Sequence, residues 1–309
     1  MDQVLCIGNT SYDITAYFEK YPEENFKYMT HDFNECTGGP AANASCLLSK
    51  WGLKSSFIGV TGDDIYGQLI EKELTDSGVD CSSMIKRKGI KTPLSIIIVN
   101  LENGSRTLVN RNTLEQTGGQ AAEGLKKYNP SVLLFDGYEL ETALKSMEMF
   151  PEAKTILDAG SLRKETECLA EKVDYLVCSE RFACSVSGIK NIKERSAYSR
   201  AFNALKGLNK NTIVITMGED GMVFEKPGLN SEITRLDAFM VKALDTTGAG
   251  DIYHGAFAWC LVQGYDLEKT IVFSAAASAL SVQKRGGITS IPSLEEVKTF
   301  LRNEGRGNW

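Results

Sequence analysis

The chain has 309 residues, 42% hydrophobic and 24% charged, and its 34 Lys and Arg against 40 Asp and Glu give a formal net charge of −6. A chain of this length and composition is expected to fold as a globular protein with a large core that needs neither disulfides nor a structural metal. The acidic balance argues against a nucleic-acid partner, which would need clustered Lys and Arg.

The sequence also indicates where the protein works. The N-terminus lacks the basic region and long apolar run of a secretory signal, and no stretch approaches the ~20 apolar residues that a membrane span needs, the run at residues 96–99 being the length of a strand. None of the eight cysteines forms a Cys-x-x-Cys pair. We therefore expect a cytoplasmic protein with free thiols and no membrane partner. The two histidines, His31 and His254, argue against multi-histidine metal chemistry and a Ser-His-Asp triad.

Apolar periodicity predicts alternating strands and helices. Strands are predicted at residues 4–7, 56–60, 132–135, 155–157, 175–177 and 212–216, and helices at 41–51, 66–77, 139–149 and 195–208. This alternation predicts an α/β fold with a mainly parallel sheet between layers of helices. Later, residues 222–225 and 233–236 are predicted to form antiparallel strands across a Pro227-Gly228 turn. Helices at 251–262, 267–283 and 294–303 follow, the last one capped by Ser293.

Two segments, 13–36 and 93–112, break this pattern because they lack helical periodicity. Within the second, residues 94–99 and 106–110 are predicted to form a hairpin around Asn103-Gly104. We interpret both segments as a small β lid inserted into an α/β body made of residues 1–12, 37–92 and 113–309.

Residues 245–251 read Asp-Thr-Thr-Gly-Ala-Gly-Asp and open a helix rich in small side chains. Gly248 and Gly250 would leave the amides of Gly248, Ala249 and Gly250 open at a helix N-terminus, which suits an anion. A carboxylate at this place would compete with that anion, so Asp251 is better explained as a general base that takes the proton of an attacking hydroxyl. A capped helix after a glycine-rich turn would explain the same residues without any chemistry.

The whole segment resembles the ribokinase or PfkB family of carbohydrate kinases, whose signature is Asp-Thr-x-Gly-Ala-Gly-Asp, then Phe or Tyr, a variable residue, Gly and Ala. The resemblance continues in order along most of the chain, including Gly38-Gly39 with Asn43 and the element Gly59 to Gly67. It implies a ribokinase-like three-layer sandwich with a β-sheet lid. It also implies transfer of the γ-phosphoryl group of ATP, with Mg²⁺, to a hydroxymethyl oxygen of a sugar, which we expect to be a ketose or a related sugar.

The resemblance further implies where the substrate binds. It assigns sugar hydroxyls to Asp13, Gly38, Gly39 and Asn43, and closure over the substrate to the lid residues Lys27, Asn110 and Arg111. Asp136 is a further expected contact because it ends an apolar strand, and the carboxyl ends of parallel strands line the ligand crevice. A structural loop around the glycines and solvated lid side chains are the competing interpretations.

For the nucleotide, the resemblance points to Thr216, Gly218 and Gly221 beside the phosphates and to Ala275 and Ala279 as small residues that leave room for adenine. Asp245 and Thr247 resemble part of the family's monovalent-cation site, so K⁺ is a further expected ion. A plain β-turn and ordinary helix packing would explain the same glycines and alanines.

One segment departs from the family pattern. Where the family carries Asn-x-x-Glu to organise Mg²⁺, this chain has Ser179-Glu180-Arg181-Phe182. A branch that includes ketohexokinase also lacks the full motif, and Glu180 could supply the missing carboxylate. Weaker magnesium handling and a non-catalytic sugar or nucleotide sensor are the alternatives. A further alternative function is a nucleoside kinase that stacks the base of its substrate on lid aromatics such as Tyr12, Tyr17 or Phe33. Separately, we expect a homodimer if lid strands pair between two subunits.

Overall fold

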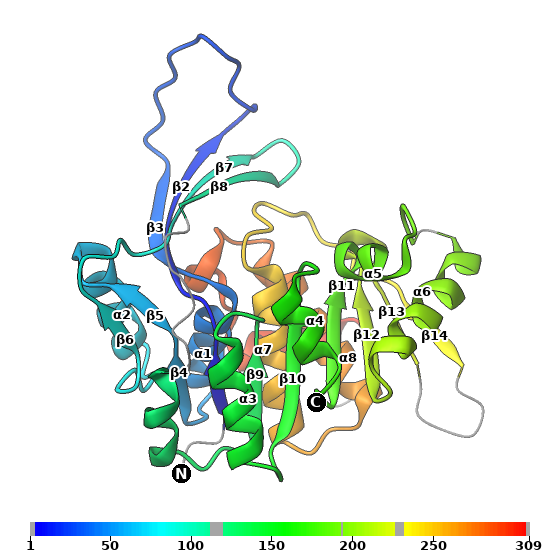
Figure 1. The fold of residues 1–309 in the computed structure, drawn as a ribbon. Helices are drawn as coiled ribbons and strands as arrows, with labels where there is room; N and C mark the ends of the chain where they lie inside the picture. Colours follow the sequence, from blue (N-terminus) through cyan, green and yellow to red (C-terminus); the bar gives the residue numbers. More distant parts are fainter. Residues whose placement is uncertain (1–3, 112–119, 193, 226–231, 307–309) are drawn as a thin grey trace.

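The structure is a computed structural model that describes residues 4–111, 120–192, 194–225 and 232–306. Its eight-stranded central sheet has the order β14-β13-β12-β11-β10-β9-β1-β4 (Figure 1). Six neighbouring strands are parallel: β1 (Val4–Ile7), β4 (Ser55–Ile58), β9 (Val132–Phe135), β10 (Lys154–Ala159), β11 (Tyr175–Ser179) and β12 (Thr212–Thr216). The last two strands at one side of the sheet, β13 (Met222–Glu225) and the edge strand β14 (Ile233–Leu236), pair antiparallel, as predicted. The Pro227-Gly228 turn lies outside the described residues.

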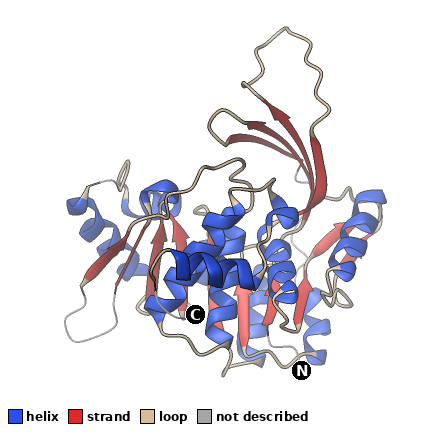
Figure 2. Ribbon diagram, turned by 180° about the vertical axis from the view of Figure 1, so that it is seen from behind, coloured by secondary structure: helices blue, strands red, loops and turns tan. Residues whose placement is uncertain are grey.

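Helices cover both faces of this sheet, so the predicted three-layer α/β architecture is confirmed. Alternate strand residues face opposite sides: Val4 and Cys6 belong to one apolar cluster, and Leu5 and Ile7 to the other. The first cluster packs against α1 (Pro40–Lys50), α2 (Ile65–Asp76), α7 (Ala249–Val262), α8 (Leu267–Ser281) and α9 (Leu294–Asn303). The second packs against η1 (Gln120–Lys127), α3 (Leu140–Met149), α4 (Lys164–Ala170), α5 (Glu180–Ser187) and α6 (Arg195–Leu208). Figure 1 looks onto the layer that contains α3 and α4, and Figure 2 shows the opposite layer.

The sequence analysis did not predict α4 and α5. Both helices are short, with seven and eight residues, so each has too few turns to show apolar periodicity. The last helix, α9, does begin at Ser293, whose side chain accepts a hydrogen bond from the Glu296 amide while Glu296 bonds back to the Ser293 amide. Within the described residues, no helix combines the length and the apolar character needed to cross a bilayer.

Close packing between α1 and α7 sets up the site described below. Helix α7 is buried along almost its whole length, and small residues bring α1 against it. A side chain on Gly255 would lie 3.1 Å from the Ala44 Cα atom, so glycine at this position lets the two backbones approach closely. As a consequence, the first turns of both helices meet at one edge of the sheet.

A second, four-stranded sheet stands above the body (Figure 1). It has the order β3-β2-β7-β8, formed by β2 (Ser11–Phe18), β3 (Phe33–Gly38), β7 (Leu94–Asn100) and β8 (Ser105–Arg111). The predicted β7–β8 hairpin is present, and its turn places Gly104 at a φ of +68°. Two short strands, β5 (Val60–Gly62) and β6 (Ile85–Arg87), pair separately near the base of this sheet.

The two faces of this small sheet differ in burial. Asp13, Thr15 and Tyr17 alternate along β2 and are buried, whereas Ile14 and Ala16 between them are only partly buried. Because strand residues alternate between faces, the buried set marks the inner face, which lies toward the body. The outer face remains open to solvent.

Candidate active site

The polar residues of interest gather where the parallel strands end. Asp136 follows β9, Asp158 lies near the end of β10, and Ser179 ends β11. Helix α7 begins at the same edge, since the Val177 carbonyl of β11 lies next to the His254 ring of α7. Open α/β sheets bind their ligands in the crevice outside the carboxyl ends of their strands. The inner face of the small sheet covers this edge of the body.

The start of α7 offers backbone amides to an anion. Gly248 is the N-terminal cap residue, and its φ of +77° favours glycine. The amides of Gly248 and Gly250 have no acceptor in the part of the chain that the structure describes. The Ala249 amide differs from the expectation, since it donates to the Thr246 carbonyl across a long 3.3 Å bond. The helix N-terminus therefore presents two open amides and one that is weakly engaged.

Asp251 lies in the first turn of α7, next to these amides. Its Oδ2 atom accepts a hydrogen bond of 2.6 Å from the Asn43 side-chain amide on α1. Burial, together with the neighbouring carboxylate of Asp158, raises the pKa of Asp251 to about 7, while the Asn43 hydrogen bond opposes the shift. A carboxyl group with a pKa near neutrality is well suited to take a proton from a hydroxyl group.

The sequence analysis did not select His254 and Asp158 as site residues, but both interact with Asp251. The His254 Nδ1 atom is 2.7 Å from the Gly250 carbonyl and 3.1 Å from Asp158 Oδ2. The His254 Nε2 atom is 3.1 Å from the Val177 carbonyl. Asp158 could have been found from sequence, because it closes an apolar strand in the same way as Asp136.

On the sugar side, Asp13 lies on the inner face of the small sheet. Its Oδ1 atom accepts a 2.7 Å hydrogen bond from the Ser11 hydroxyl, and burial raises its pKa. A side chain on Gly38 would lie 2.0 Å from Asp13 Oδ2, so only glycine leaves space for this carboxylate. Gly39 begins α1 with a φ of +98°, and the Asn43 Oδ1 atom is buried without a hydrogen-bond partner among the described residues. An unpaired buried acceptor here suits a substrate hydroxyl.

The Asp136 carboxylate accepts its hydrogen bonds from backbone amides of the protein. Its Oδ2 atom accepts from the amides of Asn9 and Ala41, and its Oδ1 atom accepts from the Tyr138 amide. Burial is the main cause that raises the pKa of Asp136 to about 7, and these three hydrogen bonds oppose it. In this structure Asp136 joins the loop after β1 to the start of α1, so its effect on substrate would act largely through the backbone around it.

The three lid residues that the sequence analysis selected lie in different surroundings. Asn110 is exposed and lies opposite Ser95 on the inner face, toward the site. Arg111 donates to the Thr92 carbonyl at 2.9 Å and lies over the Tyr66 ring, at the base of the small sheet. Lys27 is exposed in the long connection between β2 and β3, and no contact joins it to the other site residues that the structure describes.

The small sheet touches the glycine-rich loop through its hairpin and through β2. Arg106 of β8 donates to the Thr246 hydroxyl, which in turn donates to the Gly104 carbonyl at 3.2 Å. Tyr17 donates to Asp245 Oδ2 at 2.9 Å. Neither Arg106 nor Tyr17 could be assigned to these contacts from sequence, because the register of the lid strands decides which side chains reach the loop.

The nucleotide-side residues are organised around helix ends and turns. Ser179 caps α5 by accepting from the Phe182 amide, and it donates to the Gly160 carbonyl at 2.8 Å. Glu180 Oε1 accepts from the Ile192 amide at 3.0 Å, so this carboxylate is partly used within the fold. Thr216 ends β12 and pairs with Ser179 across the sheet.

The glycine candidates for the nucleotide site lie in a turn, and the alanine candidates lie on α8. Gly218 and Gly221 bound the turn η2 (Gly218–Asp220), and a side chain on Gly221 would lie 2.2 Å from the Leu236 carbonyl. Ala275 belongs to the apolar core, so helix packing accounts for it, whereas Ala279 is partly exposed. Ala279, but not Ala275, therefore lies at the surface of α8.

The expected cation-site residues lie together beneath the lid. Asp245 is buried and accepts hydrogen bonds from Tyr17, from the Gly286 amide and from the Thr247 amide. The Thr247 hydroxyl is buried and has no partner within the described ranges. Such a set of hydroxyl and carboxylate oxygens has the chemistry of a site for a hard cation.

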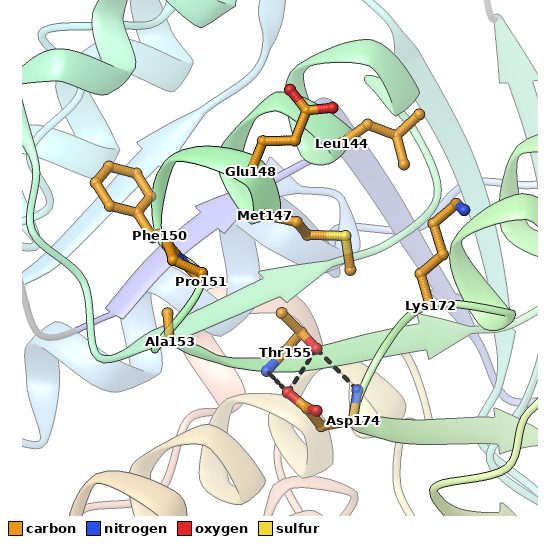
Figure 3. Close-up of a pocket in the computed structure, with 9 residues that line it drawn as sticks. All are labelled: Leu144, Met147, Glu148, Phe150, Pro151, Ala153, Thr155, Lys172 and Asp174. Atoms are coloured by element: carbon orange, nitrogen blue, oxygen red, sulfur yellow. Dashed lines mark hydrogen bonds between the residues drawn. The ribbon is translucent and has the colours of Figure 1, made fainter.

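A pocket on the body lies at the other edge of the sheet (Figure 3). It has a volume of about 520 Å³ and includes Thr155 near the start of β10 and Asp174 just before β11. Asp174 Oδ2 accepts from both the amide and the hydroxyl of Thr155 at 2.8 Å, so these polar groups satisfy one another. This pocket is separate from the residues around Asp251.

Known proteins match this arrangement over nearly the whole chain. The sequence profile of the pfkB family of carbohydrate kinases matches residues 1–294. The chain is 27% identical to the deoxyribokinase of Salmonella typhi, covering 96% of this chain and 98% of the relative. It is 28% identical to the ribokinase of Staphylococcus aureus, with the same coverage, and 27% identical to the 5-dehydro-2-deoxygluconokinase of Bacillus subtilis, covering 96% and 95%.

Solved structures give the same result for the fold. A candidate ribokinase from Agrobacterium tumefaciens aligns with a TM-score of 0.87 at 25% identity and covers 99% of both chains. Arabidopsis thaliana ribokinase complexed with ribose and ATP aligns with a TM-score of 0.79 at 22% identity, covering 97% of this chain and 99% of that one.

Proposed function

Because this chain belongs to the pfkB family of carbohydrate kinases and is a phosphotransferase that acts on a sugar hydroxyl, we propose that it transfers the γ-phosphoryl group of ATP to a hydroxymethyl oxygen of a ketose or a related sugar. One observation carries the proposal: Asp251 lies beside the open amides of Gly248 and Gly250 at the start of α7. Phosphoryl transfer needs such a base together with donors that stabilise charge on the transferred group.

Each residue of the site has a stated task in this proposal. Asp251 takes the proton from the sugar hydroxyl, and the amides of Gly248 and Gly250 bind the oxygens of the transferred phosphoryl group. Asp13 and the free Oδ1 atom of Asn43 bind sugar hydroxyls. The small sheet closes over the crevice and excludes water, which would otherwise compete as an acceptor.

Mg²⁺ fits this site as a partner of the nucleotide. Kinases usually hold Mg²⁺ through the substrate phosphates, several waters and one or two carboxylates, so a complete protein cage is not needed. Glu180 is the expected carboxylate, and one of its oxygens already accepts from the Ile192 amide. When bound, Mg²⁺ would neutralise phosphate charge. K⁺ would be held by Asp245 and by the unpaired hydroxyl of Thr247.

The proposal also includes a homodimer formed through the lid. Val109 and Ile96 are cross-strand neighbours on the outer face, and they are 59% and 47% exposed. A second copy of the chain that packs its own lid on this face would bury these side chains. A molar mass near that of one chain, 33.9 kDa, would contradict this part of the proposal.

The experiment is an ADP-release assay with ATP, Mg²⁺ and K⁺ over a panel of ketohexoses, ribose, 2-deoxyribose, 5-dehydro-2-deoxygluconate and nucleosides, with mass analysis of the product. We expect one sugar of the panel to be phosphorylated. A nucleoside 5′-phosphate as the preferred product would instead identify a nucleoside kinase. Binding of a sugar by calorimetry without ADP release would identify a non-catalytic sensor, which the engaged carboxylate of Glu180 favours as the second candidate.

A further inference from the structure

The side chain of His254 is buried at the centre of the site, between α7 and two strands. It is 4% exposed and lies one helical turn after Asp251. Its ring contacts the backbone of its own helix at Gly250, the side chain of Asp158 on β10 and the backbone of Val177 on β11. Nothing in the proposed transfer uses this histidine directly.

The neighbours of the ring determine how many protons it carries. The Gly250 and Val177 carbonyls can only accept hydrogen bonds, and they lie 2.7 Å from Nδ1 and 3.1 Å from Nε2. A neutral imidazole has one nitrogen without a proton, so one lone pair would then face a carbonyl oxygen at hydrogen-bond distance. With both nitrogens protonated, each contact becomes a hydrogen bond, and the buried positive charge has Asp158 Oδ2 as a counter-charge at 3.1 Å.

We propose that His254 is a positioning residue for phosphoryl transfer: as an imidazolium paired with Asp158, it fixes the first turn of α7 against β10 and β11 and keeps Asp251 available as the carboxylate base. This inference rests on the proposed function of Asp251. The Gly250 carbonyl belongs to the same turn as the open amides, so the His254 hydrogen bond also orients the anion site.

The charges around Asp251 come from several elements. Asp158 on β10 opposes its ionisation, whereas His254 on α7 and Arg106 on β8 favour it, and the Asn43 amide on α1 donates to it. Asp136 on β9 adds a further carboxyl group that interacts with Asp158. Without the positive charge of His254, the negative charges of Asp158 and Asp251 would be less compensated, and Asp251 would be protonated more readily.

The protonation state can be read directly, because the chain has only two histidines. A His31→Gln variant leaves His254 as the single histidine, and long-range ¹H–¹⁵N spectra of ¹⁵N-labelled protein distinguish one protonated ring nitrogen from two. At a pH on the plateau expected for the pH–rate profile, both nitrogens of His254 should be protonated, because both face hydrogen-bond acceptors. A neutral ring under these conditions overturns the proposal. This measurement needs no turnover, so it remains informative if the assigned sugar chemistry is wrong.

The second experiment follows kcat/KM against pH for His254→Gln, which removes the charge and keeps one N–H donor. We expect the acid limb to move to higher pH by about one unit, with activity lower by roughly tenfold below the limb and largely recovered above it. Asp158→Asn removes both the charge that opposes ionisation of Asp251 and the counter-charge of the imidazolium, so it should move the limb by less than His254→Gln does. Equal loss of activity by His254→Gln at every pH, with the limb unmoved, would show a purely structural role and overturn the proposal.

His31→Gln serves as the matched control for the kinetic experiment as well, because His31 is exposed in the connection between β2 and β3. Its pH profile should coincide with that of the unaltered protein. Thermal unfolding of each variant distinguishes a folding defect from a shift of the base. If His254→Gln does not fold, the spectra of the His31→Gln protein still decide the question.

Discussion

The α/β body and the small lid sheet contribute to the candidate active site in different ways. In the body, Asp251, Asn43 and Asp158 lie on buried elements that pack against one another, with the strands β1, β4 and β9 buried on both faces. In the lid, the strand β8 is exposed along six of its seven residues. The lid reaches the glycine-rich loop through a few side chains, chiefly Tyr17 and Arg106.

This difference indicates a division of labour. The body needs no rearrangement to bring Asp251 next to the open amides, so the groups that the proposed mechanism uses are preorganised. The lid is joined to the body largely through individual polar side chains, including Tyr17, Asn34 and Asp32, and such contacts can break and reform more easily than a packed core. This suits an element that opens for substrate and closes during transfer. Changes in the body should therefore affect kcat, and changes in the lid should affect KM or assembly.

The largest effect is expected for Asp251→Asn. The amide keeps the shape of the side chain but cannot take a proton, so kcat should fall by roughly 10²–10⁴ while sugar binding persists. Kinetics and calorimetry on the same sugar measure the two properties. Asp76→Asn, on the exposed face of α2, is the matched control and should leave kcat unchanged. Undiminished turnover by Asp251→Asn would remove the base from the mechanism.

The buried position of that base predicts a pH dependence. The pKa of Asp251 is raised to about 7, and only the carboxylate form can accept a proton. Below that pH, kcat/KM should therefore fall about tenfold for each pH unit, and it should reach a plateau above it. A rate that stays constant down to about pH 5 would mean that Asp251 has an ordinary pKa, and that the body does not exclude water from it.

In the lid, Tyr17→Phe should have a moderate effect. It removes the hydrogen bond to Asp245, worth about 1 kcal/mol, which corresponds to a rise in the sugar KM of roughly fivefold. The kcat value should change little, because the body still holds the base. Tyr21→Phe, an exposed lid tyrosine, is the control. A fall in kcat without any change in KM would mean that Tyr17 acts through the catalytic loop and not through the lid.

The smallest effect on catalysis is expected for Val109→Glu on the outer face of the lid. A charge in the proposed subunit contact should shift the molar mass measured by light scattering from that of a dimer to that of a single chain. The kcat value should remain within about twofold, because Val109 faces away from the body. Thr107→Glu, two residues away on the same outer face, should have the same effect on the molar mass if this face forms the contact. Loss of kcat in the monomeric Val109→Glu protein would show that the second copy completes the site.

Much of this protein follows from its sequence. The alternation of apolar runs and amphipathic segments predicted the central sheet, its longer helices and the β7–β8 hairpin, since burial on one face imposes a period on the chain. Residues 245–251 were enough to predict amides at a helix start and to propose Asp251 as the base, because the whole motif lies in one continuous segment. Local chemistry of this kind needs no knowledge of the fold.

Other features were decided only by the tertiary structure. Helix packing at Gly255 and Ala44 brings Asn43 onto Asp251, and the sheet order places Asp158 and His254 behind that base. The strand register of the lid selects Tyr17 and Arg106 as its contacts with the glycine-rich loop. The burial that shifts the pKa of Asp251 likewise comes from these neighbours. Contacts between residues hundreds of positions apart depend on how elements pack in space, which no local pattern in the chain encodes.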